Sequence, residues 1–492
     1  MILEFQCDCS CASVPLAHPW EHTVGSGHAT LALRADWQEH LTRAHLELGF
    51  RHVRFHGLLS DDMGTLVWHN DKFLYSFLNA DRIIDFLLSI GMKPFIELSF
   101  MPLILASGDT TVFHYRGNVT PPKDYVQWRA LVSKLVGHWV DRYGVREVAQ
   151  WPLEIWNEPN LSAFWTGDQA AYFNLYRHAV DAIKGVDASL KVGGPATAQN
   201  AWIADFLEFC DSNGLAADFV STHYYPTDAF GDIGTDTVTQ LEHAPRDVML
   251  RRAEEARRHA KARPLYYTEW NISSKPRDSL HDEAFAAACA AYIVMTLQHL
   301  VDGYSFWTFS DIFEEIYFPS VPFHGGFGLM NLHGIAKPVY RAFQLLHRLG
   351  KERLPVRGEH PTVSAWVARD GRELTALFTN HAMPRHAIAT EKVRLRLVNA
   401  GKARGAVMSC IDAAHANPSA VWKDLGSPEY LSDRQVDILH AASMLAETPY
   451  AIHGCDGAIE FEVTLPPQSV VSVRIGLQDT SSASATDSRR SR

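Results

Sequence analysis

The chain has 492 residues, more than one hydrophobic core usually serves, so we expect a large domain and a smaller one. Hydrophobic residues make up 47% of the sequence and charged residues 21%, a balance that excludes a largely disordered chain. With 45 basic and 56 acidic residues the net charge is −11, which disfavours a nucleic-acid partner. No apolar run reaches 18 residues, so no membrane-spanning helix is predicted.

The N-terminal stretch has no basic residue before its apolar residues and no sustained apolar region, which predicts a cytoplasmic protein rather than a secreted one. Seven cysteines are too few for a disulfide scaffold in a chain of this length. Cys7, Cys9 and Cys11 alternate and would share one face of a strand, which leaves a metal or redox role open. The missing Cys-x-x-Cys spacing favours buried thiols instead. We expect residues 1–24 to join the C-terminal domain.

From residue 25 onward, short β-branched or aromatic runs alternate with longer amphipathic stretches, as in repeated βα units. Asp36 and Asp168 are predicted to begin two of the helices. Eight such units over residues 25–349 predict an α/β fold of the (β/α)8 TIM-barrel type. A doubly wound sheet is disfavoured, because no Gly-x-Gly-x-x-Gly motif follows an early strand. The predicted strands are residues 51–57, 92–100, 148–158, 190–195, 219–226, 264–271 and 303–311, with an eighth within 28–34.

Residues 350–477 change to alternating apolar and polar segments separated by turn residues, which predicts an antiparallel β-sandwich. A helical pattern over residues 432–447 interrupts it. Residues 478–492 are rich in serine and arginine and nearly free of bulky apolar groups, so a disordered tail is expected.

Barrels of this kind carry their chemistry at the carboxyl ends of the strands. The predicted fourth strand ends in WNEP, which contains Glu158, and the seventh ends in TEW, which contains Glu269. Two carboxyl groups that converge on one pocket suit cleavage of a glycosidic bond, because one protonates the leaving oxygen and the other stabilises the anomeric carbon. Apolar surroundings that keep one of them protonated are expected from Trp156, Trp270 and Trp307.

Many segments in order resemble the glycoside hydrolase family 39 β-xylosidases, a group of retaining barrel glycosidases. The similar segments run from about Gly25 to Gly350, and they include GSGHATLAL, VRFHGLLSDDMG, WPLEIWNEPNLSAFW, YYTEWNIS and FHGGFGL. The resemblance implies that Glu158 is the general acid/base, that Glu269 is the nucleophile, and that Asn157 binds the sugar 2-hydroxyl. The two carboxyl groups should then lie about 5 to 5.5 Å apart.

The resemblance also implies a set of residues that contact the sugar or the nucleophile. They are His56, Phe113, His223, Tyr225, Trp307, Glu314 and Glu315. Asp61 and Asp62 lack histidine or cysteine ligands at a suitable spacing, so we interpret them as loop hydrogen-bonding groups rather than a metal site. A retaining mechanism uses two protein carboxylates, and neither a metal nor an organic cofactor is expected.

The resulting hypothesis is an exo-acting retaining β-D-xylosidase whose partner is a short xylo-oligosaccharide. Alternatives are the same mechanism on an α-L-arabinoside, a β-glucoside or an α-L-iduronide, and a non-catalytic carbohydrate-binding protein. The presence of both Glu158 and Glu269 argues against a binding protein, because binding alone needs neither an acid nor a nucleophile. Glu314 and Glu315 favour a neutral sugar, because a uronate would favour a basic partner. A role of the sandwich in polysaccharide anchoring stays open, and the resemblance permits a homo-oligomer.

Overall fold

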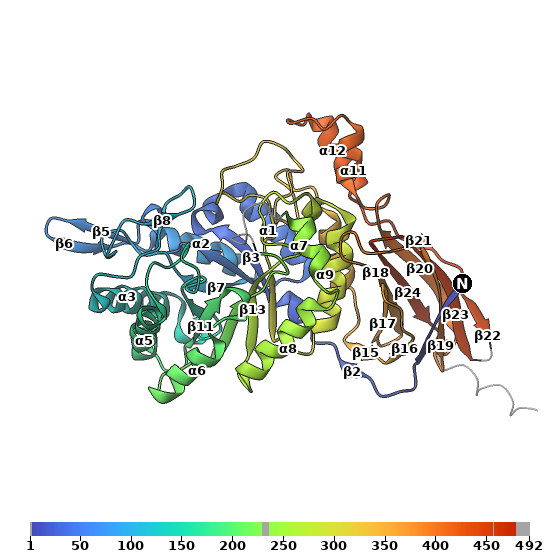
Figure 1. The fold of residues 1–492 in the computed structure, drawn as a ribbon, viewed down its shortest axis with the longest axis horizontal. Helices are drawn as coiled ribbons and strands as arrows, with labels where there is room; N and C mark the ends of the chain where they lie inside the picture. The colour runs from blue at the N-terminus through green and yellow to red at the C-terminus, as the bar shows by residue number, and fades with distance from the viewer. Residues whose placement is uncertain (1, 229–235, 456, 479–492) are drawn as a thin grey trace, which may run out of the picture.

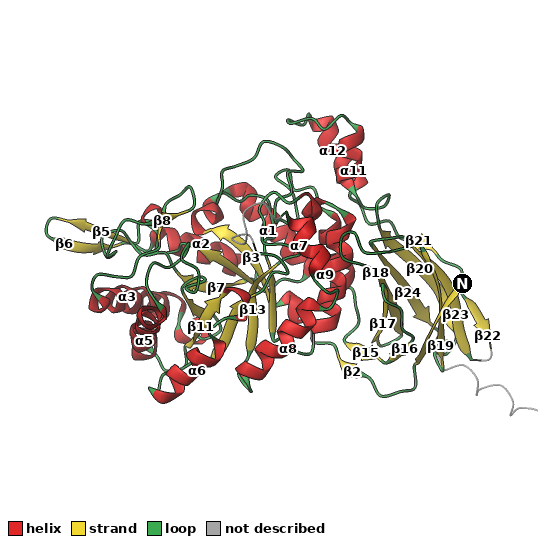
Figure 2. Ribbon diagram, viewed as in Figure 1, coloured by secondary structure: helices red, strands yellow, loops and turns green. Residues whose placement is uncertain are grey.

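The computed structural model describes residues 2–228, 236–455 and 457–478. It contains a closed barrel of parallel strands beside a sandwich of two further sheets (Figure 1, Figure 2), which confirms the predicted fold class. The predicted tail, apart from its first residue, lies outside the described residues. No helix among them combines the length and apolar character needed to cross a membrane.

The barrel closes in the order β10-β11-β12-β13-β14-β3-β4-β7, so each strand pairs with its sequence neighbour and the last of the eight, β14, closes onto the first, β3. The prediction of its first strand within residues 28–34 was wrong, because residues 29–33 form a 3-10 helix. The true strand, TVGSGH, has no apolar run to reveal it, although all six of its residues are buried. The eight strands are β3 (Thr23–His28), β4 (His52–His56), β7 (Lys93–Leu98), β10 (Pro152–Ile155), β11 (Lys191–Thr197), β12 (Phe219–His223), β13 (Leu265–Trp270) and β14 (Gly303–Phe306).

Helices surround the barrel. Asp168 caps α5 as predicted, since its side chain accepts a hydrogen bond of 2.8 Å from the Ala171 N–H. Asp36 does not cap α1; it lies in the first turn and pairs with Arg34 at 2.6 Å. The helices are α1 (Ala35–Leu48), α2 (Leu78–Ser89), α3 (Tyr125–Tyr143), α4 (Val145–Val148), α5 (Gln169–Val186), α6 (Ile203–Ser212), α7 (Thr237–His243), α8 (Val248–Ala260), α9 (Ala284–Leu297) and α10 (Pro338–His347).

Two short hairpins lie in the barrel loops. One, β5 (Leu66–His69) with β6 (Lys72–Tyr75), stands at the end of the molecule far from the sandwich (Figure 1). The other pairs β8 (Thr111–Val112) with β9 (Gly117–Asn118). Helix α9 is apolar on every side, because it packs against α10 of the barrel on one side and against the sandwich on the other.

One sandwich sheet has the order β16-β1-β19-β23-β22, and the other has the order β2-β15-β17-β18-β24-β20-β21. Strand β1, at the start of the chain, pairs in parallel with β19, with Ile2 opposite Lys392. The strands are β1 (Ile2–Asp8), β2 (Val14–Pro15), β15 (Glu352–Leu354), β16 (Val356–Arg357), β17 (Val363–Asp370), β18 (Glu373–Asn380), β19 (Glu391–Val398), β20 (Ala403–Ile411), β21 (Thr448–Pro449), β22 (His453–Cys455), β23 (Ala458–Leu465) and β24 (Ser469–Leu477).

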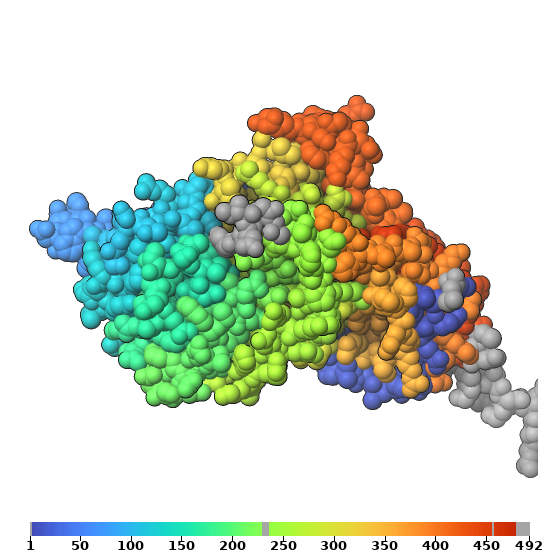
Figure 3. All heavy atoms as spheres, viewed as in Figure 1, coloured from blue at the N-terminus to red at the C-terminus, as the bar shows by residue number. Residues whose placement is uncertain are grey.

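The barrel and the sandwich each have a hydrophobic core. Cys7 and Cys9 are buried in the sandwich core, whereas Cys11 is exposed. The single helix predicted over 432–447 is shorter, α12 (Asp433–Ala442), and follows α11 (Pro418–Asp424). These two helices project beside the barrel loop that follows β14 (Figure 3), where Trp422 and Phe323 share a small apolar cluster.

Candidate active site

A cavity of about 480 Å³ opens at the carboxyl ends of the barrel strands. This is the end where enzymes of this fold carry their chemistry. Most of the residues expected at the site meet here, and several apolar side chains join them. The lining comprises His56, Val112, Phe113, Asn157, Glu158, Leu161, Phe164, Ala198, Gln199, Tyr225, Thr227, Asp228, Glu269, Ser274, Pro276, Trp307, Glu315, Ile316 and Phe327.

Glu158 and Glu269 face each other in this cavity, and both are buried. Strand β10 ends at Ile155, earlier than predicted, so Glu158 stands on the following loop with a left-handed φ of 43°. Its backbone N–H donates to the Ala196 carbonyl at 2.8 Å, which ties this loop to β11. One carboxyl oxygen of Glu158 and one of Glu269 lie within 4.8 Å of each other.

The Glu269 carboxylate is held from two sides. Its Oε1 accepts from Arg54 Nη1 at 2.8 Å, and its Oε2 accepts from the Tyr225 hydroxyl at 3.0 Å. His56 Nε2 lies 3.4 Å from the same Oε1. These contacts fix the orientation of the carboxylate, because two different donors hold its two oxygens.

Arg54 is fully buried at the centre of the barrel, and analysis of the sequence did not identify it. Its guanidinium contacts Glu154 at 2.6 Å and Glu97 at 2.7 Å in addition to Glu269. It also donates to Asn157 Oδ1 at 3.1 Å, so the Asn157 amide nitrogen is left for the cavity. The signal that could have found this cluster is a charged residue with an apolar residue on each side of it within a strand, as in HVRFH, FIEL and PLEI.

Glu158 lies in surroundings that favour its protonated form. Burial, and next the negative charge of Glu269, raise the pKa of Glu158 well above its ordinary value. His223 Nδ1 and Glu158 Oε1 are joined by a hydrogen bond of 2.8 Å. Burial, together with the positive charge of Arg54, holds the pKa of His223 well below its ordinary value, so the imidazole is neutral.

Aromatic side chains form the walls of the cavity. Trp307 lies 4.8 Å from the ring of His56, and the ring centroids of Phe113 and His56 are 6.2 Å apart. A side chain at Gly25 would approach Trp307 to 2.6 Å, so only glycine allows the indole to lie this close to β3.

Of the three tryptophans expected to surround the carboxyl groups, only Trp307 lines the cavity. Trp270 follows Glu269 on β13, so its side chain points to the opposite face of the strand and stacks on Tyr304 at 4.3 Å. Trp156 packs on Trp165, with ring centroids 5.1 Å apart, and donates to the Phe164 carbonyl.

The two neighbouring glutamates of the loop after β14 point in different directions. Glu315 lines the cavity, and its Oε1 has no hydrogen-bond partner in the described structure. Glu314 does not line the cavity; its carboxylate pairs with His28 Nδ1 at 2.7 Å. His28 Nε2 also lies 3.1 Å from Asp62, and its ring stacks on Tyr115 at 3.7 Å.

A buried charge cluster fixes the next segment of the same loop. Lys337 pairs with Asp282 and with Asp311, each at 2.7 Å, and donates to the Gly326 carbonyl at 2.8 Å. Asp311 also accepts from the Gly328 N–H at 2.7 Å. The segment between these two glycines carries Phe327 into the cavity wall.

The predicted loop role of Asp61 and Asp62 is confirmed. Asp61 accepts from the Leu103 backbone N–H at 3.1 Å, and Asp62 accepts from the Thr30 hydroxyl at 2.7 Å. One oxygen of Glu158, one nitrogen of His223 and one oxygen of Glu269 lie close enough together to bind a cation. The same three groups are equally suited to exchanging protons, because the pKa of Glu158 is raised well above its ordinary value.

A closed parallel barrel with two buried carboxyl groups, at the ends of its fourth and seventh strands, is the architecture of a barrel glycoside hydrolase. Residues 4–457 match the family described as Glycosyl hydrolases family 39. The chain belongs to this family, which confirms the resemblance found in the sequence.

Known proteins with similar sequences or structures agree with this membership. A β-xylosidase of Caldicellulosiruptor saccharolyticus is 47% identical over 93% of this chain and 95% of its own length. A β-xylosidase of Geobacillus stearothermophilus is 38% identical over 93% of this chain and 92% of its own length. A monomeric β-xylosidase of Caulobacter crescentus superposes with a TM-score of 0.85 at 32% identity, covering 97% of this chain and 100% of the other.

Proposed function

We propose that the protein is an exo-acting retaining β-D-xylosidase that releases xylose from the non-reducing end of short xylo-oligosaccharides. The observation that carries this proposal is the separation of the two carboxyl groups, whose nearest oxygens lie within 4.8 Å. Retaining glycosidases keep their carboxyl groups about 5 to 5.5 Å apart, whereas inverting enzymes need about 6.5 to 9.5 Å to admit a water molecule. The two relatives named β-xylosidase support the choice of sugar.

In the first step, Glu269 attacks the anomeric carbon while Glu158 donates its proton to the departing glycosidic oxygen. A covalent xylosyl ester forms on Glu269, and the shortened oligosaccharide leaves. In the second step, Glu158, now ionised, takes a proton from water, which attacks the anomeric carbon and releases xylose and the Glu269 carboxylate. The raised pKa of Glu158 suits the first step, because the acid must hold its proton near neutral pH.

Several neighbours assist these two residues. Arg54 and Tyr225 hold the Glu269 carboxylate in place through its two oxygens. The free amide nitrogen of Asn157 is placed to donate to the sugar 2-hydroxyl, where a stronger hydrogen bond in the transition state would accelerate the reaction. His56 and Glu315 provide polar groups for the other hydroxyls. Trp307 and Phe113 offer aromatic faces on which the C–H face of a pyranose packs.

The test is release of p-nitrophenol from p-nitrophenyl β-D-xylopyranoside by the wild type, Glu269→Ala and Glu158→Ala, with and without azide. We expect the wild type to turn over and Glu269→Ala to be inactive without azide. Azide should restore turnover to Glu158→Ala through a β-xylosyl azide product seen by NMR, because the small anion needs no general base. An α-xylosyl azide from Glu158→Ala would contradict the retaining assignment. The assignment of a xyloside as substrate would be overturned if the wild type were inactive on the aryl xyloside but active on an arabinoside, glucoside or iduronide.

We also propose that the barrel, predicted over residues 25–349 and beginning with β3 at Thr23, carries the chemistry, and that residues 350–477, joined by the N-terminal strands β1 and β2, form an accessory domain. All the residues assigned above to the reaction lie in the barrel. A barrel-only variant that loses activity together with its folded structure would show that the accessory domain supports the barrel.

A cytoplasmic location is proposed as well. Cys7, Cys9, Cys11, Cys210, Cys289 and Cys410 are free thiols, which suits a reducing compartment. Activity confined to a secreted or periplasmic fraction would contradict this proposal.

A further inference from the structure

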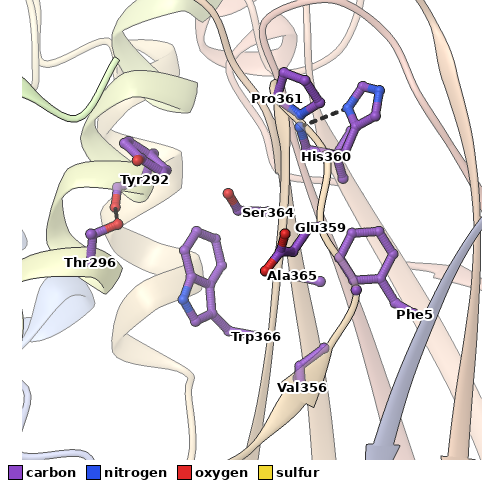
Figure 4. A pocket seen from close by; sticks show the side chains of 12 residues that line it. Phe5, Tyr292, Thr296, Val356, Glu359, His360, Pro361, Ser364, Ala365 and Trp366 are labelled. Atoms are coloured by element: carbon purple, nitrogen blue, oxygen red, sulfur yellow. Dashed lines mark hydrogen bonds between the residues drawn. The ribbon is translucent and has the colours of Figure 1, made fainter. Parts of the chain in front are cut away.

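A second cavity, of about 770 Å³, lies where the barrel meets the sandwich (Figure 4). Its volume falls within the range of small-molecule sites, about 300 to 1,000 Å³. It shares no lining residue with the active-site cavity. Helix α9 provides one wall, and strand β17 with the segment before it provides the other.

The position of this junction cavity separates it from the catalytic mouth. Tyr292 and Thr296, which line it, lie in the last two turns of α9. Helix α9 follows β13 and runs back along the barrel, so its last turns lie toward the amino ends of the strands. A molecule bound in the junction cavity would therefore leave the active site free.

Two aromatic residues face this cavity from opposite walls. Trp366 extends from β17 toward α9, and Tyr292 faces it from the helix (Figure 4). Both side chains are half-buried. Gly358 has a φ of +134°, and a side chain there would meet the ring of Phe5 at 2.6 Å, so the glycine lets the backbone lie directly on Phe5 at the edge of the cavity.

The cavity contains polar groups that can form further hydrogen bonds with a ligand. The Glu359 carboxylate lies between Trp366 and Phe5 (Figure 4), and it forms no hydrogen bond or ion pair with any residue in the described part of the chain. A carboxylate can accept several hydrogen bonds, and the indole N–H of Trp366 is a donor. Vicinal hydroxyls of a sugar are both donors and acceptors, so they match this pair.

A nearby positive charge decides between a neutral ligand and a cationic one. The Arg246 guanidinium lies over the ring of Tyr292 at 3.9 Å. It also donates to the Ser364 hydroxyl at 3.1 Å and to the Thr362 carbonyl at 2.9 Å. Arg246 therefore occupies the aromatic face that an organic cation would need, and it repels such a cation. A neutral polyhydroxylated ligand is free of this penalty.

We propose that the junction cavity is a second carbohydrate-binding site, which takes a neutral β-linked xylan chain through Trp366 and Glu359. The choice of xylan rests on the proposed function; the carbohydrate chemistry rests on the cavity itself. The indole face of Trp366 packs on the C–H face of one xylose unit. The Glu359 carboxylate accepts hydrogen bonds from the hydroxyls of that unit. The cavity is an open groove lined from both domains, so it can bind a chain other than the one the active site cleaves.

The experiment measures depletion of the protein from solution by insoluble xylan. It uses the Glu269→Ala background, so that no sugar is released during binding. Trp366→Ala and Glu359→Ala are compared with Trp68→Ala, which removes an exposed indole from the β5–β6 hairpin. We expect the association constant to fall about tenfold for Trp366→Ala and severalfold for Glu359→Ala, and to stay unchanged for Trp68→Ala.

In the background with Glu269 intact, both cavity variants should keep the wild-type kcat/KM on the aryl xyloside. Unchanged xylan binding by Trp366→Ala and Glu359→Ala would overturn the proposal, as would an equal loss for Trp68→Ala. Glu359 is exposed, so Glu359→Ala keeps the test valid even if Trp366→Ala disturbs the fold. Failure of the proposed function has a different signature, namely a wild type that does not cleave the xyloside at all.

Discussion

Glu158 is surrounded by charges that act on its proton in opposite directions. Burial and the Glu269 charge raise its pKa, Arg54 lowers it, and Asp228 adds a smaller upward contribution. Since only the protonated form donates to the leaving group, we expect kcat/KM on the aryl xyloside to fall as the pH rises through the pKa of Glu158. Asp228→Asn removes one negative charge and should move this basic limb to lower pH. A limb that stays in place or moves to higher pH would contradict this electrostatic account.

Arg54 compensates several buried carboxylates at once. In Arg54→Lys a single ammonium group keeps the charge but cannot contact Glu154, Glu269 and Asn157 together. We expect kcat to fall about 100-fold and the free energy of unfolding to fall by about 3 kcal/mol. Steady-state kinetics and chemical denaturation measure the two effects. The control is Arg251→Lys, at an exposed ion pair, where both quantities should stay near the wild-type values.

The residues of the site were predictable to different extents. The sequence pattern indicated Glu158 and Glu269, because each stands beside tryptophan and asparagine at the end of a strand. The predicted catalytic roles stay predictions until the variants are measured. Arg54 was missed because a charged residue within a strand looks the same in sequence whether it points into a barrel or toward solvent. Only the closed barrel shows that its partners, on three other strands, point to the same centre.

His28, the last residue of β3, connects the loop after β14 to the loop after β4. The His28 ring pairs with Glu314 and with Asp62. Glu315, the next residue on the loop after Glu314, faces the cavity. His28→Phe keeps the stacking on Tyr115 but removes both polar contacts. We expect KM for the aryl xyloside to rise about tenfold with kcat changed less than about threefold, because charge-assisted hydrogen bonds contribute about 1.5 to 3 kcal/mol.

The matched control for His28 is His69→Phe, at an exposed position on β5, which should leave KM unchanged. If His28→Phe lowered the melting temperature without any change in KM, His28 would only support the fold and would not position Glu315.

The strands were predictable where apolar side chains gather in one run, and the helices where apolar residues recur at helical spacing. The first barrel strand failed this criterion, because Gly25 and Gly27 leave space for Trp307 and Phe313 instead of filling it with their own side chains. The first barrel strand is therefore buried by side chains of residues that are distant in sequence. The fourth strand was predicted too long at both ends, since α4 precedes it and Glu158 already belongs to a loop.

Histidines in both the barrel and the sandwich link the stability of the protein to pH. Burial lowers the pKa of His52 to about 4 and that of His381 to about 3. An unfolded chain takes up these protons near pH 6.5, so both histidines leave the free energy of unfolding unchanged above that pH, where they are neutral in either state, and lower it below. We expect the free energy of unfolding to fall by about 1.4 kcal/mol per pH unit for each of them as the pH drops from 6.5 toward 4.

His381 tests this prediction at the contact between the two domains, where its ring lies 5.3 Å from Phe285 of α9. In His381→Asn the amide can still donate to Gln468 but cannot take up a proton in this pH range. Denaturation between pH 7 and pH 5 should show a shallower loss of stability for this variant than for the wild type. An equal slope would contradict the assignment, and His69→Asn serves as the exposed control.

The parallel pairing of β1 with β19 has a consequence for synthesis of the chain. Ile2 finds its partner Lys392 only after the entire barrel has left the ribosome. The barrel can therefore close while β1, with Phe5 and Cys7 still uncovered, waits for its sheet. We expect the sandwich to be the last part to become resistant to proteolysis during translation, and its assembly to be slow because the contact spans most of the sequence. Strand β1 thus completes its sheet only after the barrel strands that follow it in sequence.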